Sequence, residues 1–381
     1  MDPWVAAGLA SLTGRPDGPG LVPAAATVEA ITAMVATAPV EAPLALLGER
    51  AALAGWSRRG TTSCGAGTRL LPTPEGWVAV NLARPDDVAA MPAWLGLSRD
   101  PVDPWGAVVD SGRTAADLVD AGVPLGLAVA RLPEAPPQVD EPVRPRRVSE
   151  APPLAGSPLV VDLSSLWAGP LCSHLLSLGG ARVVKVESTR RPDGGRLDGT
   201  GFFDLLNHGK ASVALDLDDE EGRVQLHRLL RTADVVIEGS RPRALRQWGI
   251  DADDLLAAED GPRVWCSVTA HGRDVDAVGF GDDAAVAGGL AAWDDEGPVF
   301  LADAVADPLT GIAAHAAITG ALADGGRWLL DAALARVAAS VASPPRAATE
   351  VADPPRPGAR TLLGRAAELG ADTDAVLAGL S

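Results

Sequence analysis

The chain has 381 residues, of which 47% are hydrophobic and 22% charged, a composition typical of a soluble globular protein with room for two domains. Its formal net charge of −18 argues against nucleic acid or an anionic membrane as a general partner. No hydrophobic run approaches the roughly 20 residues of a membrane-spanning helix, and the first residues lack the features of a signal peptide. Three scattered cysteines, Cys64, Cys172 and Cys266, favour neither a disulfide framework nor a metal site. We therefore expect a cytoplasmic protein without a bound metal.

The first 44 residues contain half of a faint internal repeat. Residues 8–34 and 289–314 both read G-L-A, then an acidic turn with Gly-Pro, then a hydrophobic stretch and a helix. The second copy carries Asp307, whereas the first has Ala26 or Thr27 at that place. We interpret residues 1–44 as a degenerate copy of the later segment.

Two further regions precede the main alternating pattern. Residues 45–131 predict a small α+β domain, with a strand over residues 77–82 and a helix over residues 115–121. Residues 132–157 are dense in proline and charge and lack hydrophobic periodicity, so they predict an extended linker.

Residues 158–381 alternate between short hydrophobic runs and amphipathic helices. Strands are predicted over residues 159–163, 182–187, 212–217, 234–238 and 264–268. Helices are predicted over residues 169–178 and 242–248, and from residue 218 onward with Val224, Leu226, Leu229 and Leu230 on one side. This order predicts an α/β domain with a Rossmann-like, doubly wound and mainly parallel sheet, whose ligands bind at the carboxyl ends of the strands.

The sequence Asp307-Pro308-Leu309-Thr310 marks the start of a helix rich in alanine. Aspartate is a favoured N-cap residue and proline a favoured first helical residue. On these grounds alone, Asp307 reads as a structural cap.

Several motifs resemble the class III CoA-transferase family (CaiB/BaiF type), which includes formyl-CoA transferase and α-methylacyl-CoA racemase. They are D-L-S-x-x-x-A-G-P from Asp162, V-K-V-E from Val184, N-x-G-K-x-S-V-x-L-D-L from Asn207, and an aspartate four residues before Gly311. The tail over residues 369–380 also resembles the end of family members, and residues 45–131 resemble their small domain. The small domain thus precedes the CoA-binding domain, which implies a permuted domain order.

The resemblance implies a CoA-transferase that moves CoA between an acyl-CoA and a free carboxylic acid through an aspartyl-CoA thioester. Asp307 is the implied nucleophile and Asp303 the fallback; the backbone N–H groups near Thr310 and Gly311 are candidates for stabilising oxyanions. Coenzyme A enters as a substrate, no metal is needed, and a homodimer is expected.

Residues for binding CoA follow from the resemblance and from local charge. The loop after the first strand of the alternating region is implied to line the path of CoA, and a basic patch is needed for its phosphates; only two residues of the chain are lysines. The candidates are Leu166, Trp167, Ala168, Lys185, Arg190, Arg191, Asn207, Lys210, Ser240, Arg241 and Arg246. Trp167 and Phe203 also favour a bulky hydrophobic acyl group.

Two other functions stay open. The degenerate first copy and the permuted order also fit a non-catalytic CoA-binding paralogue or subunit. An acyl-CoA racemase is disfavoured, because Phe280 stands about where that branch has a histidine. The stretch from Gly279 to Ala284 mimics a dinucleotide fingerprint, but it does not follow the first strand of a βαβ unit.

Overall fold

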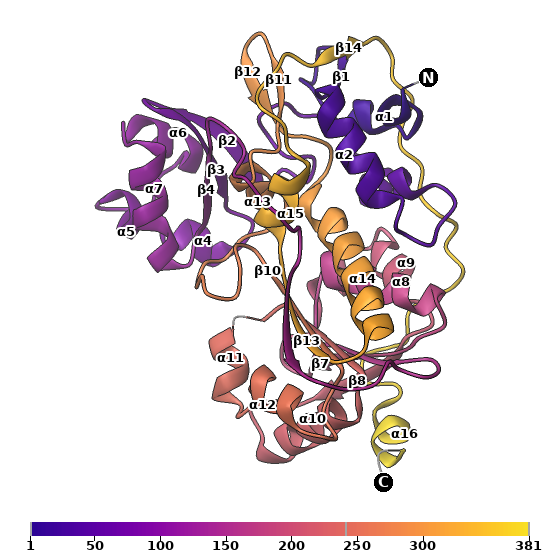
Figure 1. The fold of residues 1–381 in the computed structure, drawn as a ribbon. Coiled ribbons are helices and arrows are strands. Elements are labelled where there is room, and N and C mark those ends of the chain that lie inside the picture. Colours follow the sequence, from indigo (N-terminus) through magenta and orange to yellow (C-terminus); the bar gives the residue numbers. More distant parts are fainter. Residues whose placement is uncertain (1, 241, 380–381) are drawn as a thin grey trace.

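A seven-stranded sheet forms the centre of the computed structural model, which describes residues 2–240 and 242–379 (Figure 1). The strands follow the order β5-β13-β10-β9-β6-β7-β8, and all neighbours are parallel except β5 and β13. Their bounds are β5 (Arg144–Ser149), β6 (Leu159–Asp162), β7 (Arg182–Ser188), β8 (Ala211–Leu215), β9 (Val235–Glu238), β10 (Val264–Thr269) and β13 (Arg327–Ala333).

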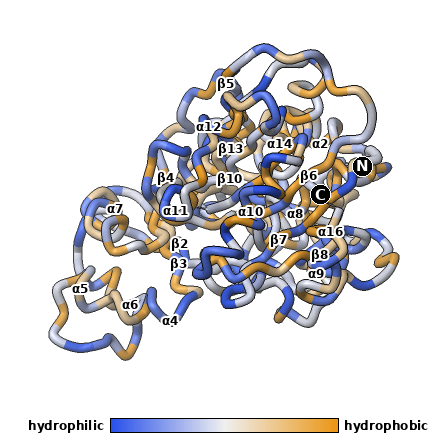
Figure 2. The backbone as a smooth tube through the Cα atoms, turned by 90° about the horizontal axis from the view of Figure 1, so that it is seen from below, coloured by the Kyte–Doolittle hydropathy of each residue, from blue (hydrophilic) through white to orange (hydrophobic). Residues whose placement is uncertain are grey.

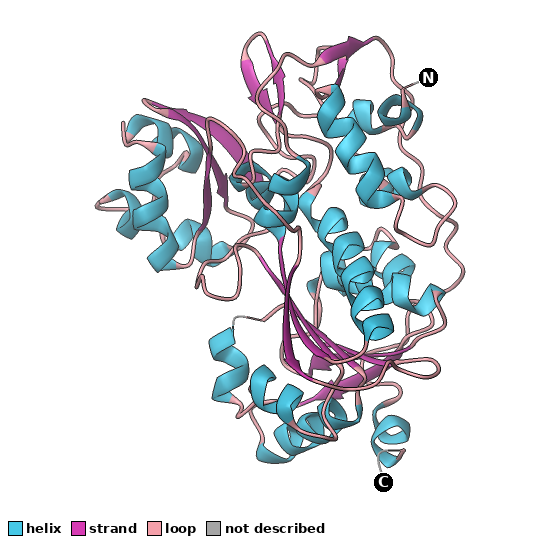
Figure 3. Ribbon diagram, in the orientation of Figure 1, coloured by secondary structure: helices cyan, strands magenta, loops and turns pink. Residues whose placement is uncertain are grey.

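Helices cover both faces of this sheet (Figure 3), and hydrophobic residues fill both layers (Figure 2). Successive strand residues point to opposite faces, so Val160 packs in one hydrophobic core and Val161 in the other. The first core includes α8 (Ala168–Leu178), α9 (Phe202–Asn207), α13 (Gly281–Ala287), α14 (Ala306–Asp324) and α15 (Leu334–Val341). The second includes α10 (Glu220–Thr232), α11 (Pro242–Gln247), α12 (Ala252–Ala257) and the edge of α16 (Thr373–Ala378). The predicted doubly wound α/β fold is therefore confirmed.

A smaller antiparallel sheet lies beside this domain (Figure 1). It consists of β2 (Thr68–Thr73), β3 (Gly76–Asn81) and β4 (Ala128–Leu132). One face packs against α5 (Met91–Leu95), α6 (Pro104–Asp110) and α7 (Ala115–Gly122), which is followed by η3 (Val123–Leu125). Helix α4 (Pro85–Ala89) contacts α5. The other face contacts α13 and Phe300. This packing places the small sheet next to the segment that leads into α14.

The N-terminal segment shares the first core of the large domain. It contains α1 (Pro3–Ala6), η1 (Leu9–Leu12), β1 (Gly20–Val22), α2 (Ala25–Val35), η2 (Pro43–Leu47) and α3 (Glu49–Ala54). Helix α2 packs against α14 and α15, and β1 pairs antiparallel with β14 (Thr349–Val351). Ala26 is the second residue of α2, as Asp307 is of α14. The interpretation of this segment as a degenerate copy remains a prediction.

The remaining regular elements are the hairpin of β11 (Ala292–Asp294) and β12 (Gly297–Val299), and the short helix η4 (Gly194–Leu197). The five strands and three helices predicted for the alternating region are present, each within about two residues at its start. Val224, however, is 53% exposed and does not belong to the buried side of α10. Among the described residues, none of the helices combines the length and the hydrophobicity needed to cross a bilayer.

The proline-rich segment holds a strand that its sequence does not predict. Strand β5 lies inside residues 132–157 and pairs antiparallel with β13 at the edge of the sheet. Four of its six residues are exposed, and three are arginines. Charged side chains are typical of edge strands because they discourage pairing with another chain, and the same charges hide the strand from a search for hydrophobic periodicity.

Candidate active site

A cavity of about 370 Å³ opens at the carboxyl ends of β6, β9 and β10. In doubly wound sheets this edge is where ligands bind. Asp307 enters the cavity from the first turn of α14, and Arg84 and Phe280 reach it from α4 and the N-terminus of α13. The other lining residues are Leu163, Ser164, Ser165, Leu166, Ala168, Gly169, Gly239, Ser240, Val268, Thr269, Ala270, Val275, Ala277, Val278, Gly279 and Leu334.

Asp307 is the second residue of α14 and not its N-cap, which is Val305. The capping interpretation from the sequence is therefore wrong, because the helix begins at Ala306, two residues before the start at Pro308 that the Asp-Pro pair suggests. The backbone of Gly281 lies close to the Asp307 carboxylate: a Cβ atom on Gly281 would lie 2.3 Å from Asp307 Oδ2 and 2.5 Å from the Ala304 carbonyl oxygen. Glycine is therefore required here for the two segments to approach.

The charge environment of Asp307 is mixed. Burial raises its pKa to about 7; Arg50 opposes this rise, and the carboxylates of Asp282 and Asp303 add to it. The backbone amide of Gly281 favours the ionised form. Burial and the nearby Asp303 also raise the pKa of Asp282 to about 6. Near neutral pH, Asp307 thus exists as both carboxylate and carboxylic acid.

Gly311, four residues after Asp307, has a packing function. A Cβ atom there would lie 2.6 Å from the carbonyl oxygen of Ala168, so glycine lets α14 cross close to α8. Thr310 and Gly311 lie well inside α14, where backbone amides bond within the helix. Their predicted part in stabilising oxyanions does not fit this position, and the Gly281 amide is the better candidate.

The two lysines are buried in structural networks and do not line the cavity. Lys185 Nζ lies 2.9 Å from Asp193 Oδ2 and donates to the Ser164 carbonyl oxygen. Lys210 Nζ lies 3.2 Å from Asp162 Oδ2 and donates to Asn207 Oδ1 at 2.9 Å. Their donors already have protein partners, and Asn207 is occupied as well. The predicted contacts of these three residues with CoA are not supported by this geometry.

The loop after β6 has residues that line the cavity and a residue that lies in the hydrophobic core. Leu166 and Ala168 line the cavity, and Leu166 is 49% exposed with a φ of 69°; their contact with CoA remains a prediction. Trp167 between them is buried, and its ring packs edge-to-face on Phe202 at 5.0 Å. Phe203 lies beneath the Arg196 guanidinium, 4.4 Å from its ring centroid. Neither Trp167 nor Phe203 lines the cavity, so the predicted bulky hydrophobic acyl group loses its support.

The other predicted phosphate contacts are spread over the surface. Ser240 lines the cavity. Arg190 is exposed and pairs with Asp216 and Asp218 at 2.9 Å each, Arg191 is exposed, and Arg241 lies outside the described residues.

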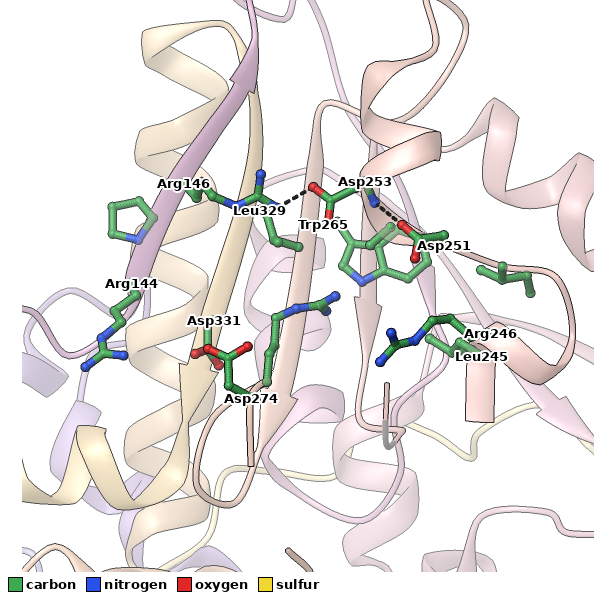
Figure 4. A pocket seen from close by; sticks show the side chains of 14 residues that line it. Arg144, Arg146, Leu245, Arg246, Asp251, Asp253, Trp265, Asp274, Leu329 and Asp331 are labelled. Carbon is green, nitrogen blue, oxygen red and sulfur yellow. Dashed lines mark hydrogen bonds and ion pairs between the residues drawn. The ribbon is translucent and has the colours of Figure 1, made fainter. Parts of the chain in front are cut away.

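Arg246 lines a separate cavity of about 540 Å³, between β5, β13 and β10 on one side and α11 and α12 on the other (Figure 4). That cavity is larger than the one at Asp307, but it holds arginines and aspartates together, such as the Arg146–Asp253 pair. We regard the smaller cavity as the candidate site, because it lies at the strand ends and contains a carboxylate that has a raised pKa and no ion pair within the described part of the chain.

Sequence reasoning missed three residues of the site. Arg84 comes from the small domain, pairs with Asp87 and lies with its guanidinium 5.7 Å from the Phe280 ring. Asp282 accepts a hydrogen bond from the Ala304 amide at 3.0 Å, and Arg50 forms an ion pair with Asp303. All three are far in sequence from Asp307, and no local motif signals their approach.

Comparison with known proteins relates the chain to CoA-transferases. A family model described as CoA-transferase family III matches residues 155–364, which is more than half of the chain. The succinate–glutarate CoA-transferase of Agrobacterium fabrum is 32% identical over 191 residues, 45% of this chain and 47% of the relative. The succinyl-CoA–D-citramalate CoA-transferase of Chloroflexus aurantiacus is 32% identical over 176 residues, 43% of each.

The chain thus spans about half the length of the curated relatives it matches. Among solved structures, a CaiB/BaiF family protein from Brucella suis is 31% identical, with a TM-score of 0.46 over 50% of this chain and 56% of that one. On the family match over residues 155–364, the chain belongs to CoA-transferase family III.

Proposed function

We propose that the protein transfers CoA between an acyl-CoA and a free carboxylic acid, with Asp307 as the covalent carrier. The observation that carries this proposal is the position of Asp307: its carboxylate faces a cavity at the strand ends without an ion-pair partner among the described residues. Asp303, the alternative nucleophile, is fully buried and forms a two-point ion pair with Arg50, so its oxygens are not available for attack.

The reaction needs only an ionised carboxylate held against the thioester. A carboxylate oxygen of Asp307 attacks the acyl carbonyl carbon, the C–S bond breaks, and a mixed anhydride and CoA thiolate form. The thiolate then attacks the aspartyl carbonyl and releases the first carboxylic acid as its carboxylate, leaving an aspartyl-CoA thioester. The acceptor carboxylate repeats both steps in reverse order and leaves with CoA, which regenerates Asp307.

The surroundings of Asp307 supply what this chemistry requires. Partial dehydration in the cavity makes its carboxylate more reactive than one in water, and the nearby Gly281 amide is placed to stabilise charge on the aspartyl oxygen. The raised pKa of Asp307 means that the attacking form accumulates as pH rises through about 7. The proposal covers acyl-CoAs and carboxylic acids as classes of substrate and names no individual pair. Assembly as a homodimer is also part of it, because the family resemblance implies a dimer.

The test is to trap the intermediate. The protein is incubated with acetyl-CoA or succinyl-CoA and its intact mass is measured; we expect a gain equal to CoA less one water. Hydroxylamine should remove the adduct and leave an aspartyl hydroxamate on the peptide that contains Asp307. Asp307→Asn should abolish the adduct, whereas the matched variant Asp303→Asn should still form it. An adduct that persists in Asp307→Asn, or no adduct in the wild-type protein, would defeat the proposal.

The same experiment separates the alternatives. A non-catalytic CoA-binding protein would bind CoA without forming the adduct. A racemase would exchange the α-proton of the acyl group with solvent, but the described residues that line the cavity include no histidine for such a step, and His271 lies outside that lining.

A further inference from the structure

The turn that leads into α14 has a strained backbone. Ala302 and Ala304 have φ angles of 53° and 42°, in the left-handed region that residues with a Cβ atom rarely adopt. The side chain of Asp303 between them is completely buried. The turn connects directly to the candidate nucleophile, because the Asp307 amide donates to the Ala304 carbonyl oxygen at 2.9 Å. Such a conformation persists only where the surrounding structure holds it in place.

Arg50 is the main partner of this turn. Its Nε and Nη2 atoms donate to the two carboxylate oxygens of Asp303 at 2.9 and 2.7 Å. Its guanidinium also contacts two aromatic rings, 5.4 Å from the centroid of Trp56 and 4.8 Å from that of Trp167. A planar fork with a two-point ion pair and two ring contacts has little freedom to move. Arg50 belongs to α3, which lies outside the segment that matches the family model.

The backbone amides of the turn are held as well. The Ala302 amide donates to Thr13 Oγ1 at 3.1 Å, and the Ala304 amide donates to Asp282 Oδ1 at 3.0 Å. Thr13 and Asp282 carry no positive charge, so among these partners Arg50 alone can both fix the turn and attract the Asp307 carboxylate.

The charges around Asp307 are therefore unbalanced without Arg50. Three carboxyl groups belong to this environment: those of Asp282 and Asp283 in α13 and that of Asp303 in the turn. The charges of Asp282 and Asp303 raise the pKa of Asp307, and the charge of Asp307 raises the pKa of Asp283. Arg84 lines the same cavity from α4, but it is paired with Asp87. Arg50 is the cation that opposes the rise in the pKa of Asp307.

We propose that Arg50 is a positioning residue for Asp307: through Asp303 it fixes the turn over residues 302–304, and it supplies the counter-charge to the carboxylates around this turn. This inference rests on the proposed function, since it gives Arg50 a part in the reaction of Asp307. It also assigns a functional role to the N-terminal segment, which supplies Arg50 and Thr13 to a site otherwise built from later residues.

The first measurement does not depend on any substrate. Protein labelled with ¹³C at the aspartate carboxyl carbons is titrated by NMR, and the Asp307 signal is identified by its loss in Asp307→Asn. In Arg50→Gln we expect the titration midpoint of Asp307 to move upward by at least about one pH unit, which leaves about tenfold less carboxylate below the midpoint. Arg15→Gln is the matched control, because Arg15 also forms a two-point ion pair, with Asp294, and has the same side-chain exposure of 26%. Its midpoint should equal that of the wild type.

The second measurement follows the rate of adduct formation with acetyl-CoA as a function of pH. Arg50→Lys keeps the charge but loses the two-point hold on Asp303, so the midpoint should stay in place while the rate falls about tenfold. If Arg50→Gln does not fold, Arg50→Lys carries the test alone, and an unchanged rate in that variant overturns the proposal.

An unchanged midpoint in folded Arg50→Gln also overturns it. If the midpoint moves but the wild type forms no adduct, the transferase function fails while Arg50 stands as the counter-charge of Asp307.

Discussion

Lys210 allows a sharp test, because the sequence predicts a ligand contact for this residue and the structure shows a buried ion pair. Its side chain is 2% exposed and has four partners, namely Asp162, Pro170, Ser173 and Asn207. Burial lowers the pKa of Lys210 to about 8, and Asp162 opposes that shift. In Lys210→Met the aliphatic stem is kept but the charge is lost, so Asp162 is left as a buried carboxylate without this partner. Breaking a buried pair in this way costs about 3–5 kcal/mol of unfolding free energy.

The assay is denaturant unfolding followed by tryptophan fluorescence. Arg190→Met is the control: Arg190 is a second predicted CoA contact, but its side chain is 60% exposed and its ion pairs are at the surface. That variant should lose far less stability than Lys210→Met, because solvent screens a surface ion pair. Removing both charges in Lys210→Met with Asp162→Asn should cost less than Lys210→Met alone, because no unpaired charge remains.

The pH dependence supplies a further check. A lysine pKa that is about 8 when folded and 10.5 when unfolded means that the unfolded state binds more protons between these values, so stability from this group rises with pH across that window. Lys210→Met should lack this rise. If Lys210→Met unfolds like the wild type but binds CoA more weakly, Lys210 is a CoA contact, as predicted from the sequence, and its buried ion pair does not stabilise the fold.

Three other predictions concern the site itself. Asp307→Asn should stabilise the protein by about 4 kcal/mol at pH 8 and by about 2 kcal/mol at pH 5, because the raised pKa of Asp307 opposes folding once the unfolded state releases its proton; thermal unfolding at both values measures this. Gly281→Ala should abolish the CoA adduct and cost about 1–3 kcal/mol of unfolding free energy, because the new Cβ atom overlaps Asp307 Oδ2 and the Ala304 carbonyl; retained adduct formation would contradict it. Trp167→Phe should slow adduct formation and weaken stability by about 1 kcal/mol, since it reduces the contacts with Arg50 and Phe202; an unchanged rate would show that Arg50 does not need this ring.

The fold was predictable because its strands are continuous hydrophobic runs. Val160 and Val161, or Val235 and Val236, face opposite cores, so both must be hydrophobic, and such runs are typical of parallel strands covered on both sides. Strand β5 has no such signal, because an edge strand with arginines at three of its six positions needs only backbone pairing with β13.

The site was only partly predictable. The place of Asp307 at the strand ends follows from the order of elements, and Leu166, Ala168 and Ser240 line the cavity as expected. Burial of Lys185 and Lys210 could not be read from the sequence, because a charged residue after a strand is as consistent with a ligand contact as with a buried pair. Arg50 and Asp282 meet Asp307 only through tertiary packing, and nothing in their local sequences marks them.

The pairing of β1 with β14 joins two stretches of chain that are more than 300 residues apart. The first of them cannot complete its hydrogen bonds until the second, which follows more than 300 residues later, has been synthesised. Contacts between such distant residues slow folding, and an unpaired strand and its hydrophobic neighbours remain exposed in the meantime. A fragment limited to residues 155–364 lacks α3 and the other N-terminal residues that complete the first core. We therefore expect that the segment that matches the family model does not fold on its own.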